Sequence, residues 1–152
     1  MSAKRFTLDA NVLVYAFDAA EAVKRVQAQQ IVAIAASLDC PLALQAVGEF
    51  FAASVRRKIL TPADAAKQAE RFLDIYETFS DDEGAHRAAA DAAAKGKFSY
   101  WDGVLLSSAA EQGCALILSE DMHDGAKLGN IVVRNPFGPK GLSDAAKEAL
   151  RV

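Results

Sequence analysis

Apolar residues gather in blocks along the chain, and the shortest of these blocks predict buried strands. Residues 5–8 form one such run, which stops at Asp9, and residues 114–118 form the strongest one. Brief apolar runs at 41–44 and 131–133 are further strand candidates. Short apolar runs bounded by polar or turn residues are typical of strands in a sheet that is covered on both faces.

Longer segments carry apolar residues every three to five positions, which is the spacing of one helix face. They predict helices over residues 19–38, 45–60, 62–76 and 99–113, and an alanine-rich helix between the break at 79–82 and Lys95. Thr61 and Pro62 form a typical helix start, and Gly96 a typical helix end. A final helix candidate begins at Ser143. Residues 11–17 fit either a continued strand or a short helix capped by Asp9.

Strands that alternate with helices predict an α/β fold with a parallel sheet and helices on both faces. The gaps between the strand candidates are long enough for the crossovers that parallel strands need. No repeat, low-complexity linker or shift in composition divides the chain. We therefore expect residues 1–152 to form a single domain.

Composition and charge narrow the possible functions. The frequent alanines favour helix, and the net charge of −3 excludes a broad basic field for nucleic acid. Any contact with nucleic acid must then use a local patch or bound cations. Cys40 and Cys114 have apolar neighbours and no metal-ligand spacing, which favours buried thiols in a reducing compartment. No apolar run is long enough to cross a membrane, so a cytoplasmic protein is expected.

Four acidic residues stand where an α/β fold places its ligands. Asp9 and Asp121 follow the two clearest strand candidates, and ligands bind beyond the carboxyl ends of parallel strands. Glu49 and Asp102 lie on predicted helices that flank this edge. The glycine-rich motifs of dinucleotide and P-loop sites do not occur in the chain.

Each acid also has an ordinary structural explanation. Asp9 and Asp121 can cap the next turn, Asp102 fits a capping box with Ser99, and Glu49 can be a solvated helix residue. Together, however, four carboxylates at one edge repel one another and raise some of their pKa values unless a cation is present. An oxygen-rich carboxylate cluster of this kind suits Mg²⁺ or Mn²⁺.

The segments around these acids resemble, in order, the four motifs of PIN-domain nucleases. Residues 8–13 are similar to the opening D-x-N motif, and residues 45–50 to a second motif with one Glu on a helix. Residues 99–106 resemble the third motif, and residues 116–122 the fourth, in which Ser or Thr stands two positions before the last Asp. Residues 132–137 also resemble the end of VapC-type toxins from bacterial toxin–antitoxin pairs. The resemblance spans about residues 6–137.

This resemblance implies a PIN-like three-layer α/β/α sandwich with a short parallel sheet. It also implies a Mg²⁺- or Mn²⁺-dependent endoribonuclease that hydrolyses RNA phosphodiester bonds with a metal-activated water and is inhibited by a cognate antitoxin. The catalytic and metal-binding residues would be Asp9, Glu49, Asp102 and Asp121. Two further residues would support them: Asn11 would orient Asp9, and Ser119 would support Asp121 or a metal-bound water.

Several roles stay open at the level of sequence. Either Glu120 or Asp121 is the acid that faces the metal, and the spacing from Ser119 favours Asp121. Asp124 is a further acid with no assigned role. Arg56, Arg57 and Lys97 are candidates for contacts with the RNA phosphates, although basic residues at a helix end also complement the helix dipole. Trp101 either packs against its neighbours or stacks on a base.

Partners and rival functions follow from the same patterns. A homodimer is expected from the helices at 62–95, where apolar residues beside many alanines suit close helix packing, unless they fill the monomer core. These residues are Phe72, Leu73, Tyr76 and Phe79. The antitoxin is expected to insert a basic side chain into the acidic pocket, the alternative being a distant hydrophobic groove. Rival functions are a catalytically silent PIN-fold module that binds RNA or protein and a receiver-type signalling domain.

Overall fold

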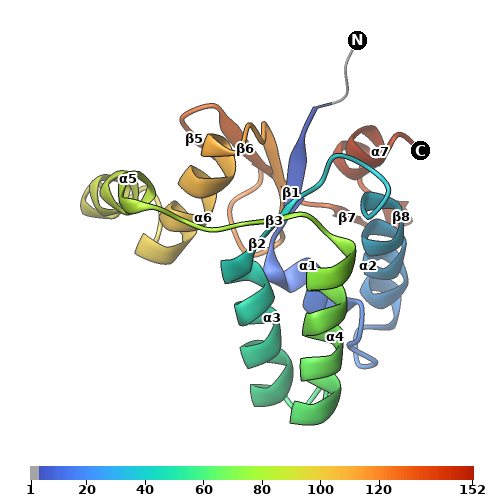
Figure 1. Ribbon diagram of the computed structural model, residues 1–152. Helices are drawn as coiled ribbons and strands as arrows, with labels where there is room; N and C mark the ends of the chain where they lie inside the picture. Colours follow the sequence, from blue (N-terminus) through green and yellow to red (C-terminus); the bar gives the residue numbers. More distant parts are fainter. Residues whose placement is uncertain (1–3) are drawn as a thin grey trace.

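The computed structural model describes residues 4–152, which form alternating strands and helices (Figure 1). The strands are β1 (Phe6–Leu8), β2 (Leu42–Ala43), β3 (Thr78–Phe79), β4 (Leu116–Leu118), β5 (Lys127–Leu128), β6 (Ile131–Arg134), β7 (Phe137–Gly138) and β8 (Gly141–Leu142). The helices are α1 (Ala10–Tyr15), α2 (Ala22–Ala35), α3 (Leu44–Arg56), α4 (Pro62–Ile75), α5 (Glu83–Ala94), α6 (Tyr100–Glu111) and α7 (Asp144–Leu150).

The main sheet has the strand order β1-β4-β6-β5. Strands β1, β4 and β6 run parallel, and β5 adds an antiparallel edge next to β6. A separate parallel pair, β2 and β3, lies beside β1, where the Thr7 hydroxyl donates a 2.6 Å hydrogen bond to the carbonyl of Pro41. The carboxyl ends of β1 and β4 therefore meet at one edge of the sheet.

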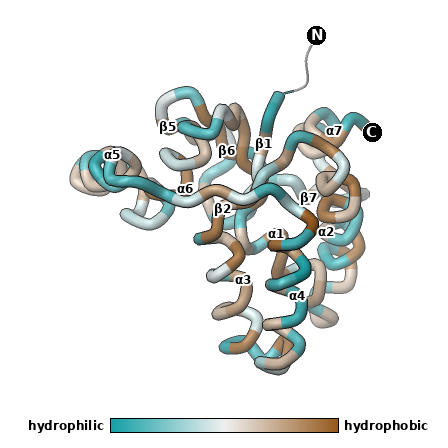
Figure 2. The backbone as a smooth tube through the Cα atoms, viewed as in Figure 1, coloured by the Kyte–Doolittle hydropathy of each residue, from teal (hydrophilic) through white to brown (hydrophobic). Residues whose placement is uncertain are grey.

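Alternation along the strands sends side chains into two hydrophobic layers, one on each face of the sheet. Leu8 and its register partner Leu118 pack into one layer with residues of α1, α2, α3, α4 and α7. Ile117 and Val133, which are also partners, pack into the other layer with α6. In Figure 2 hydrophobic segments gather around β2 and β6, whereas much of α4 is hydrophilic. The expected α/β/α layering with a short parallel sheet is confirmed.

Most of the predicted helices are present, with shorter limits. Of residues 11–17, which the pattern left open, 11–15 belong to helix α1. The helix follows Asp9, whose carboxylate accepts a hydrogen bond from the backbone of Ala10. Thr61, Ser99 and Ser143 cap α4, α6 and α7 as their sequence positions indicate. The sequence pattern missed the two-residue strands β3, β5, β7 and β8. No helix within residues 4–152 is both long and apolar enough to cross a membrane.

The residues that suggested a dimer interface lie mostly inside the monomer. Phe72, Tyr76 and Phe79 are each about 5–6% exposed and belong to the two core layers. Only Leu73 is open to solvent, with 44% of its surface exposed. These aromatic residues thus fill the core of one chain, and they give no support to the expected homodimer.

Candidate acidic site

Four elements bring the predicted acids to one cavity of about 310 Å³. Asp9 follows β1, Asp121 lies three residues after β4, Glu49 lies within α3, and Asp102 lies in the first turn of α6. The wall of the cavity includes Asp9, Asn11, Glu49, Arg56, Arg57, Asp102 and Asp121. Residues more than 100 positions apart in the sequence thus meet beyond the carboxyl ends of β1 and β4, as the strand pattern predicted.

Asp9 is the most deeply placed of these acids, with only 6% of its surface exposed. Its carboxylate accepts hydrogen bonds from the Ser119 hydroxyl at 2.7 Å and from the Ala10 backbone at 2.7 Å. Burial raises the pKa of Asp9 to about 6, and the charges of Glu49 and Asp102 add to this rise, while the two hydrogen bonds oppose it. Asp9 therefore carries its negative charge at neutral pH at a cost in folding energy.

A chain of side-chain hydrogen bonds fixes the position of Asp9. The amide of Asn11 donates to the Ser119 hydroxyl at 3.1 Å, and this hydroxyl donates to Asp9. The Asn11 carbonyl oxygen accepts from the backbone of Glu120 at 3.1 Å and so ties α1 to the end of β4. The family resemblance implied that Asn11 would orient Asp9 by hydrogen bonding and that Ser119 would support Asp121 or a metal-bound water. In the structure Asn11 acts through Ser119, because the buried Ser119 side chain lies next to Asp9.

The structure separates the neighbouring acids Glu120 and Asp121. Glu120 turns away from the cavity, where it accepts a hydrogen bond from Tyr15 at 2.6 Å and pairs with Lys24 at 2.9 Å. Burial alone would raise the pKa of Glu120, but these two partners hold it below its ordinary value. Asp121 lines the cavity. Asp124 is bound to the Asn135 backbone and to Arg134, outside the cavity.

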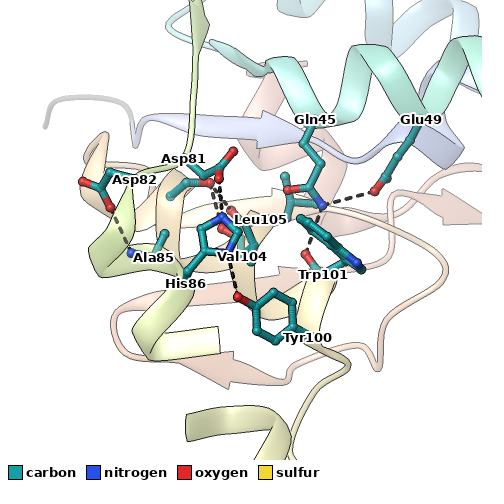
Figure 3. Close-up of polar contacts among 11 residues, drawn as sticks. Gln45, Glu49, Asp81, Asp82, Ala85, His86, Tyr100, Trp101, Val104 and Leu105 are labelled. Carbon is teal, nitrogen blue, oxygen red and sulfur yellow. Dashed lines mark hydrogen bonds and ion pairs between the residues drawn. The ribbon is translucent and has the colours of Figure 1, made fainter. Parts of the chain in front are cut away.

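Glu49 is linked to the first turn of α6 by one glutamine. The Gln45 amide donates to Glu49 at 3.1 Å and to the backbone carbonyl of Trp101 at 3.0 Å (Figure 3). Because Asp102 follows Trp101 directly, this bridge connects Glu49 on α3 to the first turn of α6, which carries Asp102. No motif indicated this bridge, because the contact joins residues 56 positions apart.

Basic residues occupy one side of the same cavity. Arg56 and Arg57 line it at the end of α3, and Arg57 pairs with Asp18 at 3.1 Å. The Asp18 side chain is 7% exposed and also accepts from the backbone of Ala20, so it is a fixed anchor for Arg57. Asp18 was not foreseen, because a single acid in a loop carries no motif. Lys97 is exposed and does not line the cavity.

The donor atoms around the cavity fit a hard divalent cation in chemical type. Carboxylate oxygens dominate, with the amide of Asn11 beside them, and such oxygen donors suit Mg²⁺ or Mn²⁺. Within residues 4–152, however, no three His, Cys, Asp or Glu side chains come close enough to form a ready-made metal-binding group. The acids share a cavity wall in this arrangement without converging on one point.

Comparison with known proteins finds similarity in structure and none in sequence. No family model matches the sequence, and no curated protein matches it. Among solved structures, the chain is similar to the toxin VapC20 of Mycobacterium tuberculosis, described as cleaving the sarcin–ricin loop. The identity is 16%, the match covers 76% of this chain and 89% of the other, and the TM-score is 0.61.

Two complexes show the same fold. VapBC2 from Rickettsia felis, bound to a DNA fragment from its promoter, matches with 13% identity, 86% and 97% coverage and a TM-score of 0.61. A toxin–antitoxin complex from Klebsiella pneumoniae matches with 16% identity, 86% and 96% coverage and a TM-score of 0.60. These likenesses extend over nearly the whole length of the relatives, and they confirm the fold that the sequence motifs implied.

Proposed function

We propose that the protein is a metal-dependent endoribonuclease and the toxin of a toxin–antitoxin pair. The observation that carries this proposal is the gathering of Asp9, Glu49, Asp102 and Asp121 around one cavity at the carboxyl edge of the sheet. The fold is similar to that of toxins, one of which is described as cleaving the sarcin–ricin loop. The four acids therefore occur together in the fold that the motifs implied.

The four carboxylates would hold Mg²⁺ or Mn²⁺, and the bound ion would activate a water and offset charge on the phosphate. The chain itself supplies the surroundings. Asn11 and Ser119 hold Asp9 in one orientation, and the pair Asp18–Arg57 keeps a guanidinium at the cavity wall. Arg56 and Arg57 would contact the RNA phosphates, because a guanidinium matches phosphate oxygens with a planar set of donors. Lys97 is a weaker candidate for this role.

The test is cleavage of RNA by the wild type and by Asp102→Asn, with Mg²⁺ and with EDTA. We expect Asp102→Asn to lose at least about 100-fold in rate, because removing one charge weakens the cation site. Asp91→Asn is the matched control, since Asp91 is a solvent-exposed acid on α5, paired with Lys95. Circular dichroism checks that both variants fold. Full activity of folded Asp102→Asn, or of the wild type in excess EDTA, would contradict the proposal.

The same experiment addresses the second candidate, a catalytically silent PIN-fold module. One observation favours it, namely that the acids do not form a ready-made metal group within the described residues. Binding of RNA without any cleavage, at any Mg²⁺ or Mn²⁺ concentration, would select this alternative.

The proposed partners are an RNA substrate, a cognate antitoxin and a second copy of the chain. Structures similar to this one include a VapBC assembly and a toxin–antitoxin complex, which supports a protein partner. The homodimer remains a prediction that light scattering tests. A cytoplasmic location and the choice between Mg²⁺ and Mn²⁺ also belong to this proposal.

A further inference from the structure

Three aromatic rings stand together next to the acidic cavity, and we call them the rim aromatics: His86, Tyr100 and Trp101. Trp101 is 59% exposed and Tyr100 is 37% exposed. Single exposed apolar residues are common on protein surfaces. Here, however, two large rings are exposed side by side, and the residue after them is Asp102, which lines the cavity.

The rim aromatics hold one another in place. The rings of Tyr100 and Trp101 meet edge-to-face at 5.4 Å, and those of His86 and Trp101 at 5.8 Å. His86 is itself fixed on α5, because its two ring nitrogens contact the Tyr100 hydroxyl and Asp81 (Figure 3). A ring held in this way loses little conformational freedom when a ligand stacks on it.

The position of Trp101 is coupled to the acids. Its backbone carbonyl accepts from Gln45, which also donates to Glu49, and Figure 3 shows the indole ring beside this Gln45–Glu49 pair. Trp101 is thus linked through Gln45 to Glu49 and precedes Asp102 in the chain, and both of these acids line the cavity. A nucleotide next to a phosphate in the cavity would lie within reach of this ring.

The charge of the protein explains why the rim aromatics would contribute to its affinity for RNA. The chain carries a net charge of −3, so attraction to phosphates is confined to a local patch such as Arg56 and Arg57 and to bound cations. Stacking of bases on aromatic rings supplies affinity without net charge and tolerates any base. It also requires an unpaired base, which selects single-stranded RNA.

We propose that Trp101, supported by Tyr100 and His86, is a stacking platform for an unpaired RNA base beside the phosphate bound in the cavity. This inference rests on the proposed ribonuclease function and adds to it a residue that binds the base next to the phosphate. Trp101 acts as a binding residue, and His86 acts through it by holding the ring. The platform predicts a preference for loops or strand ends over duplex RNA.

Trp101 is the only tryptophan of the chain, so its fluorescence reports on the platform directly. The full chain is titrated with a short single-stranded RNA, in EDTA and again in Mg²⁺, with RNA integrity checked on a gel. The comparison probe is a chain of the same length made of abasic ribose phosphates. We expect the RNA, but not the abasic chain, to quench Trp101 and to shift its emission.

Binding of a labelled RNA to variants gives the second readout. We expect Trp101→Ala to bind about 5- to 100-fold more weakly, and Trp101→Phe to recover most of the affinity through its ring. Phe51→Ala is the matched control, because Phe51 is an exposed aromatic residue that does not line the cavity. It should bind like the wild type. Circular dichroism and light scattering are recorded for each variant.

Each contrary result has a distinct meaning. Wild-type affinity and cleavage in folded Trp101→Ala, or equal quenching by the abasic chain, would overturn the platform and leave the proposed nuclease intact. A change of molecular mass in Trp101→Ala would overturn the platform in favour of an interface with a second copy. A wild type that neither binds nor cleaves RNA would overturn both proposals.

Discussion

Asp9 shows at the scale of one residue how a functional carboxylate opposes stability. Its pKa of about 6 lies above the ordinary value of 3.8, because the side chain is buried near two other acids. The folded state therefore binds the Asp9 proton more tightly than the unfolded state does. Above about pH 6 the ionised form costs folding energy, on the order of 3 kcal/mol for a shift of this size. Below about pH 3.8 both states are protonated and the cost disappears.

Asp9→Asn should therefore stabilise the protein while it abolishes activity. An asparagine keeps the shape and still accepts a hydrogen bond from Ala10, but it carries no charge. In EDTA at pH 8 we expect the free energy of unfolding to rise by about 1–3 kcal/mol. This gain should shrink as the pH falls from about 7 to about 4. Urea unfolding at several pH values measures both effects.

Asp91→Asn is the control for the loss of one charge, and it should change stability by less than about 0.5 kcal/mol. A lower stability of Asp9→Asn at pH 8, or a gain that does not depend on pH, would contradict this account of Asp9.

The sequence located the acids better than it located their partners. Asp9 and Asp121 could be selected because each follows a strand candidate, and Glu49 and Asp102 because they lie on helices that flank the same edge; all four line the cavity. The hydrogen bond from Ser119 to Asp9 could not be assigned, since it depends on how β1 and β4 pair across more than 100 residues. The salt bridge between Asp18 and Arg57 was missed because a single acid in a loop carries no motif.

At the scale of elements, the close packing of α5 on α6 supports the helix that carries Asp102. Gly103 in α6 lies against the backbone of Ala89 in α5, and a Cβ atom at Gly103 would approach the Ala89 Cα to 2.9 Å. No Cβ of an ordinary residue fits at this distance. The glycine thus permits the close contact between α5, which carries His86, and α6, whose first turn carries Asp102.

Replacing two helix glycines with alanine should consequently change the free energy of unfolding in opposite directions. Gly103→Ala should lower the free energy of unfolding by about 1–3 kcal/mol, because α5 must shift to accept the new methyl group. Gly48→Ala should raise it by about 0.5–1 kcal/mol, since nothing lies within 4 Å of the new Cβ and alanine favours the helix. Urea unfolding of both variants at one pH gives the comparison. Equal effects would mean that the α5–α6 contact is not tight.

The elements that the sequence predicted well are those with local signals. Helices α4, α6 and α7 carry a capping Thr or Ser whose side chain accepts a backbone hydrogen bond. The strands β3, β5, β7 and β8 are two residues long, so they show no periodicity at all. They exist because neighbouring backbones complete their hydrogen bonds, which is a property of the tertiary fold.

At the scale of the whole molecule, two surfaces are candidate binding sites for the proposed antitoxin. One is the acidic cavity. The other is a groove of about 440 Å³ between α2 and α4, which we call the α2–α4 groove. It is lined mainly by apolar side chains, among them Phe17, Val32 and Ile75. Ile75 is 47% exposed, so a partner segment can reach it.

We expect the antitoxin to inhibit by placing an arginine in the acidic cavity. Four carboxylates give this cavity a strongly negative potential, and charge-assisted contacts of a guanidinium with carboxylates are about twice as strong as neutral hydrogen bonds. The arginine would compete with the cation for the same oxygens. Inhibition should then weaken as Mg²⁺ rises, and the double variant Asp9→Asn/Asp102→Asn should bind the antitoxin at least about tenfold more weakly.

Titration of the antitoxin against three proteins separates the two surfaces: the wild type, the double variant, and Ile75→Glu, which places a charge in the α2–α4 groove. If the cavity is the inhibitory site, inhibition by saturating antitoxin persists in Ile75→Glu, even where affinity falls, because the arginine still reaches the acids. Equal affinity of the wild type and the double variant, with no dependence on Mg²⁺, would assign inhibition to the groove. The four acids would then serve RNA cleavage and not antitoxin binding. Inhibition of the toxin would depend on apolar contacts, which salt does not weaken.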